Sequence, residues 1–354
     1  MALGLEVKKK LFGFIDGQPV TLFTVKNNNG FEVACINYGC IITKLLAPDR
    51  DGNIENIVLG FDCIEPYVSN THFLGAVVGR FAGRIQNGKF SLEGQDYQVR
   101  PNDNQHHLHG GQKGFSHVLW DAQVMEQEHE VTIAFSYVSP DGEEGYPGNL
   151  KMNVHYTISR NHNKLVIDYS GISDKTTVLN VTNHTYFNLS GNLKRDILDH
   201  ELTMNSDYFL ELDDELLPTG ECVAVDHSVF DFRKGRKVRE GVASNHPQTI
   251  LAAKGYDHPF LLPKGQESEI VVVDHESGRK LVVETTEPMV VLYTGNKLDG
   301  PDSITGVKLR NYLGLCLETQ RPPDSLRHPH FPSSIIQAGE AYQAQTTYSF
   351  GLID

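Results

Sequence analysis

Short segments that alternate apolar and polar residues, separated by turn residues, make up most of this 354-residue chain. The segment 31–38, Phe-Glu-Val-Ala-Cys-Ile-Asn-Tyr, repeats with a period of two, as a strand with one buried face does. Val, Ile, Thr, Tyr and Phe fit a pleated, half-buried surface and are the common residues of these segments. Further segments of this kind are 131–138, 165–169, 281–284 and 289–293. The pattern predicts a fold built of β-strands.

Turn residues between these segments account for the high glycine content of 32 residues. Asn-Asn-Asn-Gly at 27–30 and Pro-Asp-Gly at 140–142 are examples, because Gly adopts a positive φ freely and Asn and Asp tolerate it. No amphipathic stretch exceeds about three helical turns, although the segment 233–243 has partly helical character. The chain has no repeat, linker or shift in composition. It therefore predicts an all-β sandwich or barrel that forms one large body.

The charge balance excludes several classes of partner. The chain has 31 Lys and Arg residues against 45 Asp and Glu residues, a formal net charge of −14. An acidic chain without a basic stripe cannot neutralise a nucleic-acid backbone. No apolar run is long enough for a membrane-spanning helix. We therefore expect neither a nucleic acid nor a membrane as partner.

The cysteines predict a reducing compartment. Their number is odd and no pair has Cys-x-x-Cys spacing, which argues against a disulfide framework and a thiolate zinc site. The N-terminal basic residues follow a short apolar stretch, which is the wrong order for a secretory signal. We expect buried, reduced thiols in a cytoplasmic protein. The cysteines are Cys35, Cys40, Cys63, Cys222 and Cys316.

Two segments combine basic residues with glycine. In Val-Gly-Arg-Phe-Ala-Gly-Arg-Ile at 78–85, Arg84 either closes a salt bridge at a strand end or presents its guanidinium to ligand oxygens. A Gly-Gly pair at 110–111 follows three closely spaced histidines, His106, His107 and His109. A zinc site would need a further ligand fixed elsewhere, so a histidine directed into a cleft is the favoured interpretation. The single tryptophan, Trp120, is expected to pack nearby.

Three further polar residues lie among apolar ones. His184, in the segment 178–189, is either a satisfied core histidine or a proton donor at neutral pH. Asp257 lies between aromatic residues in Gly-Tyr-Asp-His-Pro-Phe at 255–260. Glu318 follows an apolar run, where it either pairs with an arginine or gains base strength by desolvation.

Together, these segments resemble the galactose mutarotase (aldose 1-epimerase) family. The resemblance spans nearly the whole chain, and its motifs occur in the order typical of the family. The most specific are Leu-His-Gly-Gly-x-x-Gly-Phe at 108–115, Asn-His-x-Tyr-Phe-Asn-Leu at 183–189 and Leu-Glu-Thr-Gln at 317–320. Supporting matches lie at 217–221, 230–232 and 293–296.

The resemblance implies a large β-supersandwich, with residues 1–354 as a single domain. It implies an enzyme that interconverts the α and β anomers of free aldohexoses such as galactose and glucose, without metal or organic cofactor. His184 would be the general acid and Glu318 the general base. The residues expected to contact the sugar are Arg84, His109, Tyr186, Asp257 and, beside the acid, Thr185.

Two positions depart from the pattern of many family members. Gly83 stands where many have an asparagine that touches the sugar, and Val291 stands where many have glutamine. Each change removes a hydrogen bond to the substrate and leaves the acid–base pair intact. We therefore expect these positions to alter the sugar preference rather than the reaction.

Other functions stay open at this point. An epimerase could act on the reducing end of a disaccharide, and a glycoside hydrolase could pair Glu318 with Asp257. A non-catalytic sugar-binding protein would not require His184 together with Glu318. A histidine-cluster metalloprotein would lose its activity to chelators, which we do not expect. The partner is a small sugar, and the protein is expected to be a monomer or a homodimer.

Overall fold

The computed structural model describes residues 5–69, 71–263 and 269–353. Within these residues, antiparallel strands form three large sheets and several two-stranded ones. Helices are short: α1 (Glu65–Val68), α2 (Val238–Val242), α3 (Pro247–Leu251) and the 3-10 turns Gln86–Gly88, Phe115–His117, Glu143–Gly145 and Ser325–Arg327. The all-β prediction is confirmed, and none of these helices has the length and apolar character that a membrane span needs.

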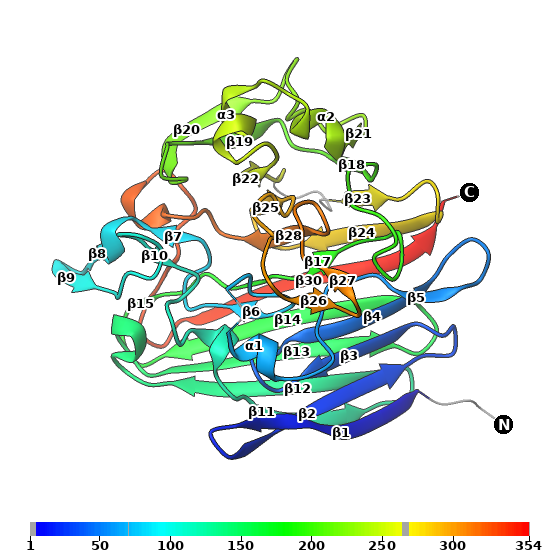
Figure 1. The fold of residues 1–354 in the computed structure, drawn as a ribbon. Helices are drawn as coiled ribbons and strands as arrows, with labels where there is room; N and C mark the ends of the chain where they lie inside the picture. Colours follow the sequence, from blue (N-terminus) through cyan, green and yellow to red (C-terminus); the bar gives the residue numbers. More distant parts are fainter. Residues whose placement is uncertain (1–4, 70, 264–268, 354) are drawn as a thin grey trace.

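In Figure 1 the five-stranded sheet lies in the lower half, and the nine-stranded sheet runs from β11 near the bottom to β21 at the upper right. The five-stranded sheet runs in the order β1 (Glu6–Ile15), β2 (Gln18–Lys26), β3 (Glu32–Ile36), β4 (Ile42–Pro48), β5 (Ile54–Asn56). The nine-stranded sheet runs in the order β11 (Asp121–Glu126), β12 (Glu130–Ser139), β13 (Leu150–Ser159), β14 (Lys164–Ser173), β30 (Ala341–Leu352), β24 (Arg279–Thr285), β23 (Ile270–Val273), β18 (Glu201–Met204), β21 (Arg236–Lys237).

The third large sheet has six strands and extends from the middle to the top of the same view. Its order is β17 (Tyr186–Phe187), β28 (Leu315–Gln320), β25 (Met289–Tyr293), β22 (Asp257–Leu261), β19 (Tyr208–Leu212), β20 (Pro218–Ala224). The two-stranded sheets pair β7 (Arg84–Ile85) with β10 (His107–Leu108), β8 (Lys89–Leu92) with β9 (Gln95–Gln98), β6 (Val77–Val78) with β16 (Thr182–Asn183), β15 (Thr177–Val178) with β29 (Ile335–Ile336), and β26 (Ser303–Ile304) with β27 (Val307–Lys308).

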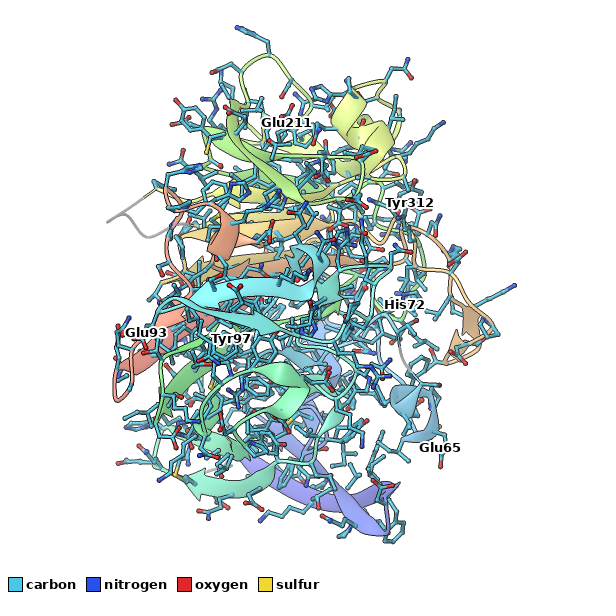
Figure 2. The ribbon with its side chains drawn as sticks, turned by 90° about the vertical axis from the view of Figure 1, so that its left-hand side faces the viewer. Glu65, His72, Glu93, Tyr97, Glu211 and Tyr312 are labelled. Atoms are coloured by element: carbon cyan, nitrogen blue, oxygen red, sulfur yellow. The ribbon has the colours of Figure 1, made fainter. Side chains whose placement is uncertain are left out.

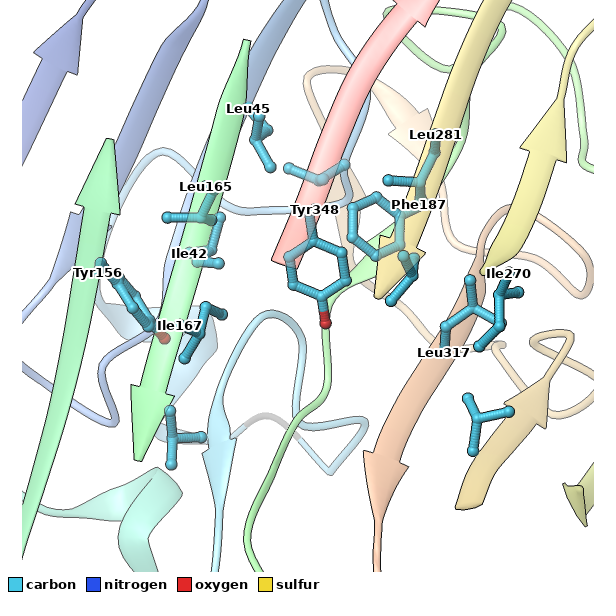
Figure 3. Close-up of a cluster of buried hydrophobic side chains, with 14 of the residues drawn as sticks. Ile42, Leu45, Tyr156, Leu165, Ile167, Phe187, Ile270, Leu281, Leu317 and Tyr348 are labelled. Carbon is cyan, nitrogen blue, oxygen red and sulfur yellow. The ribbon is translucent and has the colours of Figure 1, made fainter. Parts of the chain in front are cut away.

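One buried hydrophobic cluster joins the three large sheets. Phe23 on β2 meets Phe135 on β12 edge to face, with ring centroids 6.2 Å apart. Phe187 on β17 packs on Tyr348 of β30 with centroids 5.2 Å apart, and Figure 3 shows this contact in the core. The nine-stranded sheet therefore packs against both of the other large sheets. Burial of the apolar surface between them is the main force that holds the sheets together.

The strands agree with the sequence pattern. Residues 289–293 form β25, and the other alternating segments lie within or overlap β3, β12, β14 and β24. The segment 233–243 contains the short strand β21 followed by α2, so its partly helical character is confirmed. Trp120 is buried, and its indole N–H donates to the carbonyl of Phe115, close to the Gly-Gly segment as expected.

The prediction that all cysteines are buried is wrong in part. Cys35, Cys40 and Cys316 are buried, whereas Cys63 and Cys222 are exposed. Cys63 precedes the short helix α1, and Cys222 lies on β20, which ends the order of the six-stranded sheet. All of them are free thiols.

The two faces of strand β28 differ in character. Leu315 and Leu317 belong to the hydrophobic cluster, and Thr319 Oγ1 hydrogen-bonds Thr346 Oγ1 of the nine-stranded sheet at 2.6 Å. Since side chains alternate along a strand, Glu318 and Gln320 must point to the opposite face. The alternation Leu-Cys-Leu-Glu-Thr-Gln thus places one face of β28 in the core and leaves Glu318 and Gln320 on the opposite, polar face.

Truncation of the core side of β28 is expected to destabilise the protein strongly. Leu317→Ala removes a side chain that is 1% exposed and leaves a cavity, which lowers the free energy of unfolding by about 2–5 kcal/mol. Urea denaturation followed by tryptophan fluorescence measures this loss. The control Ile172→Ala, at a side chain that is 44% exposed, should change stability by less than about 0.5 kcal/mol. Equal effects of the two variants would contradict the placement of β28.

Candidate active site

A cleft of about 280 Å³ lies over the polar face of the six-stranded sheet. Its lining residues come from strands of this sheet, from the β7–β10 pair and from the loop after α1. His72, on that loop, lines the cleft and is labelled in Figure 2. The size is close to the lower end of the range for small-molecule sites, which suits a compact ligand.

The pairing of β17 with β28 brings the expected acid and base together. Tyr186 on β17 stands opposite Cys316 on β28. His184 lies two residues before Tyr186, and Glu318 lies two residues after Cys316. In an antiparallel pair these two positions face each other on the same side of the sheet. Their side chains meet with His184 Nε2 3.3 Å from Glu318 Oε1.

Burial changes the proton affinity of both groups. Each side chain is only 5% exposed. Burial raises the pKa of Glu318 well above its usual range; the nearby Asp257 adds to the rise and Arg84 opposes it. Burial lowers the pKa of His184 to about 4. The low-dielectric cleft therefore disfavours the charged form of each group.

His109 is fixed as a hydrogen-bond donor. The backbone N–H of Gly83 donates to His109 Nδ1 at 3.2 Å, so the neutral ring carries its proton on Nε2. Burial holds the pKa of His109 well below its usual value, and repulsion from Arg84, and from His184 when that ring is protonated, adds to the effect. Its ring meets that of His184 edge to face, with centroids 5.3 Å apart. The backbone behind it is tight, because a Cβ on Gly110 would lie 1.8 Å from a carbonyl oxygen.

Arg84 and Asp257 line the cleft with opposite hydrogen-bonding character. Asp103 accepts a hydrogen bond from Arg84 Nε at 2.8 Å, which fixes the guanidinium. Burial raises the pKa of Asp257, while Arg84 and Lys297 lower it. The cleft therefore offers both a cationic donor and an acceptor for hydroxyl groups.

Tyr186, Gly83 and Val291 also line the cleft, but Thr185 does not. Tyr186 donates its hydroxyl to the carbonyl of His72 at 3.0 Å, so its ring face, rather than its hydroxyl, is turned to His184. The side chain of Thr185 is 1% exposed and lies on the other face of the chain from its two neighbours. The expected sugar contact of Thr185 does not fit this geometry.

The two departures from the family pattern make one side of the cleft apolar. Gly83 has φ +79°, and a Cβ there would lie 2.7 Å from Pro323 Cβ. An asparagine at this position therefore requires Pro323 to shift. Val291 stands directly between Glu318 and Pro259 in the sheet. A valine there offers no hydrogen bond next to the carboxylate.

Sequence reasoning missed several cleft residues. Gln320 lines the cleft, and its buried Oε1 has no hydrogen-bond partner within the described residues. The alternation along β28 could have identified it, because it lies two residues after Glu318. Phe73, whose ring packs on His109 with centroids 4.8 Å apart, lies in a loop without any periodic signal. Cys316 Sγ lies 3.4 Å from His184 Nδ1.

The His106–His107 pair has structural contacts. His107 Nδ1 contacts the carbonyl of Arg100 at 2.6 Å, and its Nε2 contacts Tyr146 Oη at 2.7 Å. His106 Nδ1 accepts the backbone N–H of Asn87 at 3.1 Å. Neither histidine lines the cleft.

The donor set His109, His184 and Glu318 lies close enough together to hold a metal ion, with ligand atoms within 4.8 Å of one another. The tautomer of His109 does not fit this use. A metal on Nε2 would leave the proton on Nδ1, where it would face the N–H of Gly83. These residues therefore form a hydrogen-bonding site rather than a metal site.

Comparison with known proteins identifies the family. The sequence profile of the family "Aldose 1-epimerase" matches residues 21–349. The chain belongs to the aldose 1-epimerase family. It is 42% identical to the galactose mutarotase of Bos taurus, over 98% of this chain and 99% of that protein. It is 34% identical to the aldose 1-epimerase of Haemophilus influenzae, over 97% and 99%.

Solved structures agree with this assignment. The crystal structure of galactose 1-epimerase from Lactobacillus acidophilus superimposes with a TM-score of 0.88 at 30% identity, covering 99% of this chain and 100% of that one. The expected mutarotase-like fold and the membership of the family are confirmed. As an aldose 1-epimerase family member, the protein is an isomerase.

Chelators are expected to leave the activity unchanged. The reason is the tautomer of His109, which keeps a proton on the nitrogen that a metal would need. Polarimetry of freshly dissolved α-D-galactose, before and after dialysis against EDTA, measures the catalysed anomerisation rate. A loss of rate that added Zn²⁺ restores would contradict this prediction.

Proposed function

We propose that the protein catalyses the interconversion of the α and β anomers of free aldohexoses, galactose and glucose among them. The observation that carries this proposal is the contact of His184 Nε2 with Glu318 Oε1, 3.3 Å apart, in a cleft that also holds Arg84, His109 and Asp257. Anomerisation needs one acid and one base, and this pair supplies both. The family and its mutarotase members support the same reaction.

Ring opening needs two proton transfers. Glu318, as carboxylate, takes the proton of the C1 hydroxyl. As the C1–O5 bond breaks and C1 becomes a carbonyl, His184, as imidazolium, gives its proton to O5. Each positioned group of this kind contributes roughly 10²–10⁴-fold to the rate. No electron leaves the sugar, so no redox cofactor is required.

Ring closure reverses these transfers. The open aldehyde turns about its C1–C2 bond and presents the other face of the carbonyl to the C5 hydroxyl. His184 takes the proton back from that hydroxyl as the ring forms, and Glu318 returns a proton to O1. Both groups return to their starting state, and only the configuration at C1 has changed.

The charged form of the pair arises from a proton shift between its members. Without a bound sugar, burial favours the proton on Glu318. Transfer of this proton across the 3.3 Å contact gives the imidazolium and the carboxylate. Arg84 favours this form, because its positive charge lowers the pKa of Glu318. His109 donates from Nε2 and stabilises negative charge that develops on a sugar oxygen.

The wider properties of the protein form part of the proposal. We propose that residues 1–354 make a single domain, which is supported by a hydrophobic cluster with members from Phe23 to Phe350. Exposed free thiols at Cys63 and Cys222 are compatible with the reducing conditions of the cytoplasm. The protein works as a monomer or homodimer, with a sugar as its only substrate and no metal or organic cofactor.

Removal of either member of the pair is expected to abolish most of the activity. Glu318→Gln and His184→Asn should each lower the catalysed anomerisation rate by at least about 10²-fold. Polarimetry with α-D-galactose measures the rate above the spontaneous background, and thermal denaturation confirms that each variant is folded.

A matched control exists for the carboxylate. Glu287 is also buried, with a pKa raised by burial, but it accepts a hydrogen bond from Tyr342 Oη away from the cleft. Glu287→Gln should therefore retain near-normal activity. Near-normal activity of a folded Glu318→Gln variant would show that the base is another group.

The pH dependence of kcat/KM is expected to be bell-shaped. On the acid side, activity falls when His184, with a pKa of about 4, keeps a proton while Glu318 is also protonated. On the alkaline side, activity falls when the pair loses its only proton, and the raised pKa of Glu318 moves this loss above the usual carboxyl range. Rates corrected for spontaneous anomerisation measure the profile. A profile without an acid limb would contradict the single-proton pair.

A further inference from the structure

The turn between β19 and β20 encloses the side of the cleft remote from the reacting pair. Leu212 and Pro218, at its two ends, and Leu216, within it, line the cleft. Strand β19 is the third strand from β28, which carries Glu318. Across the sheet this separation is roughly 14 Å, from a strand spacing of about 4.8 Å. The turn therefore borders the end of the cleft that is remote from Glu318.

Leu216 has an unusual backbone conformation. Its φ is +61°, which is rare for a leucine because its side chain clashes with the backbone there. Asp213 holds the turn in this form: its carboxylate accepts the backbone N–H of Leu217 at 3.0 Å, and its carbonyl accepts the N–H of Leu216. The surrounding bonds thus hold a strained residue whose side chain lies at the cleft.

The tip of the turn is bound to the opposite rim. Gln105 donates to Glu215 Oε1 at 2.6 Å, and His106 Nε2 lies 3.5 Å from the same oxygen. The loop that carries these two residues also carries Asp103, which holds Arg84. Figure 2 shows this side of the molecule, with Glu211 of β19 above the β8–β9 hairpin that carries Tyr97. The contact spans the two rims and fixes the turn relative to the sugar-binding guanidinium.

We propose that Leu216 is a specificity-determining residue, whose side chain closes the far end of the cleft and limits the length of the sugar that fits. This inference rests on the proposed function. The apolar side chain contacts the C–H groups of the sugar at the end opposite C1. A second ring attached at that end meets the turn, which the Glu215 contact holds in place.

The test compares glucose with maltose, which presents the same reducing ring and carries a second one. Leu216→Gly removes the side chain at a φ that glycine adopts without a clash, so the protein should keep its Tm. The ratio of kcat/KM for maltose to that for glucose should rise on the order of tenfold. Leu216→Asn, a smaller residue that tolerates positive φ, should raise the ratio less.

Two further variants distinguish the effect of the Leu216 side chain from a general disturbance of the turn. Glu215→Ala leaves Leu216 in place but removes the contact with Gln105, and should raise the ratio slightly. The control Thr305→Gly replaces another residue of positive φ, exposed in the β26–β27 turn and away from the cleft, and should leave the ratio unchanged.

An unchanged or lower ratio in folded Leu216→Gly would overturn the inference, because the side chain would then either not reach the sugar or support the second ring. Such a result would leave the proposed function intact, since wild type would still anomerise glucose. A wild-type protein without activity on glucose and galactose would contradict the proposed function and this inference together.

Discussion

The register between β17 and β28 is the constraint on which the active site depends. Tyr186 pairs with Cys316, and this pairing sets His184 against Glu318. Because side chains alternate along a strand, a slip by one residue would turn Glu318 into the core and expose Leu317. The hydrophobic cluster that buries Leu317 therefore also fixes the position of the proposed acid–base pair. In this protein, the stability of the sheet and the position of Glu318 relative to His184 depend on the same strand, β28.

Burial also sets the proton affinities of the two groups. The same low-dielectric surroundings raise the pKa of Glu318 and lower that of His184, which is the basis of the proposal that the two groups share one proton. Arg84 moderates the effect on the carboxyl, and the N–H of Gly83 fixes His109 as a donor. A cleft with one mobile proton and fixed donors around it suits a reaction that moves a proton from one sugar oxygen to another and back.

Much of the fold and part of the site could be predicted from the sequence. The alternation at 289–293 matches β25, and the motif residues His184, Glu318 and Arg84 line one cleft. Thr185 does not line the cleft, because its place next to His184 in the sequence puts its side chain on the opposite face of the chain. The positive φ of Leu216 and the contact of Glu215 with Gln105 depend on segments far apart in the sequence, which no local pattern reports.

The claim that His184 and Glu318 hold a single proton can be measured directly. Protein labelled with ¹⁵N-histidine reports the protonation of the His184 ring nitrogens by NMR as the pH is changed, with His184→Asn used for the assignment. The account predicts that the sugar-free ring stays neutral at neutral pH and is half protonated only near pH 4. Titration of this ring at about 6.5, the value of an unperturbed histidine, would contradict it.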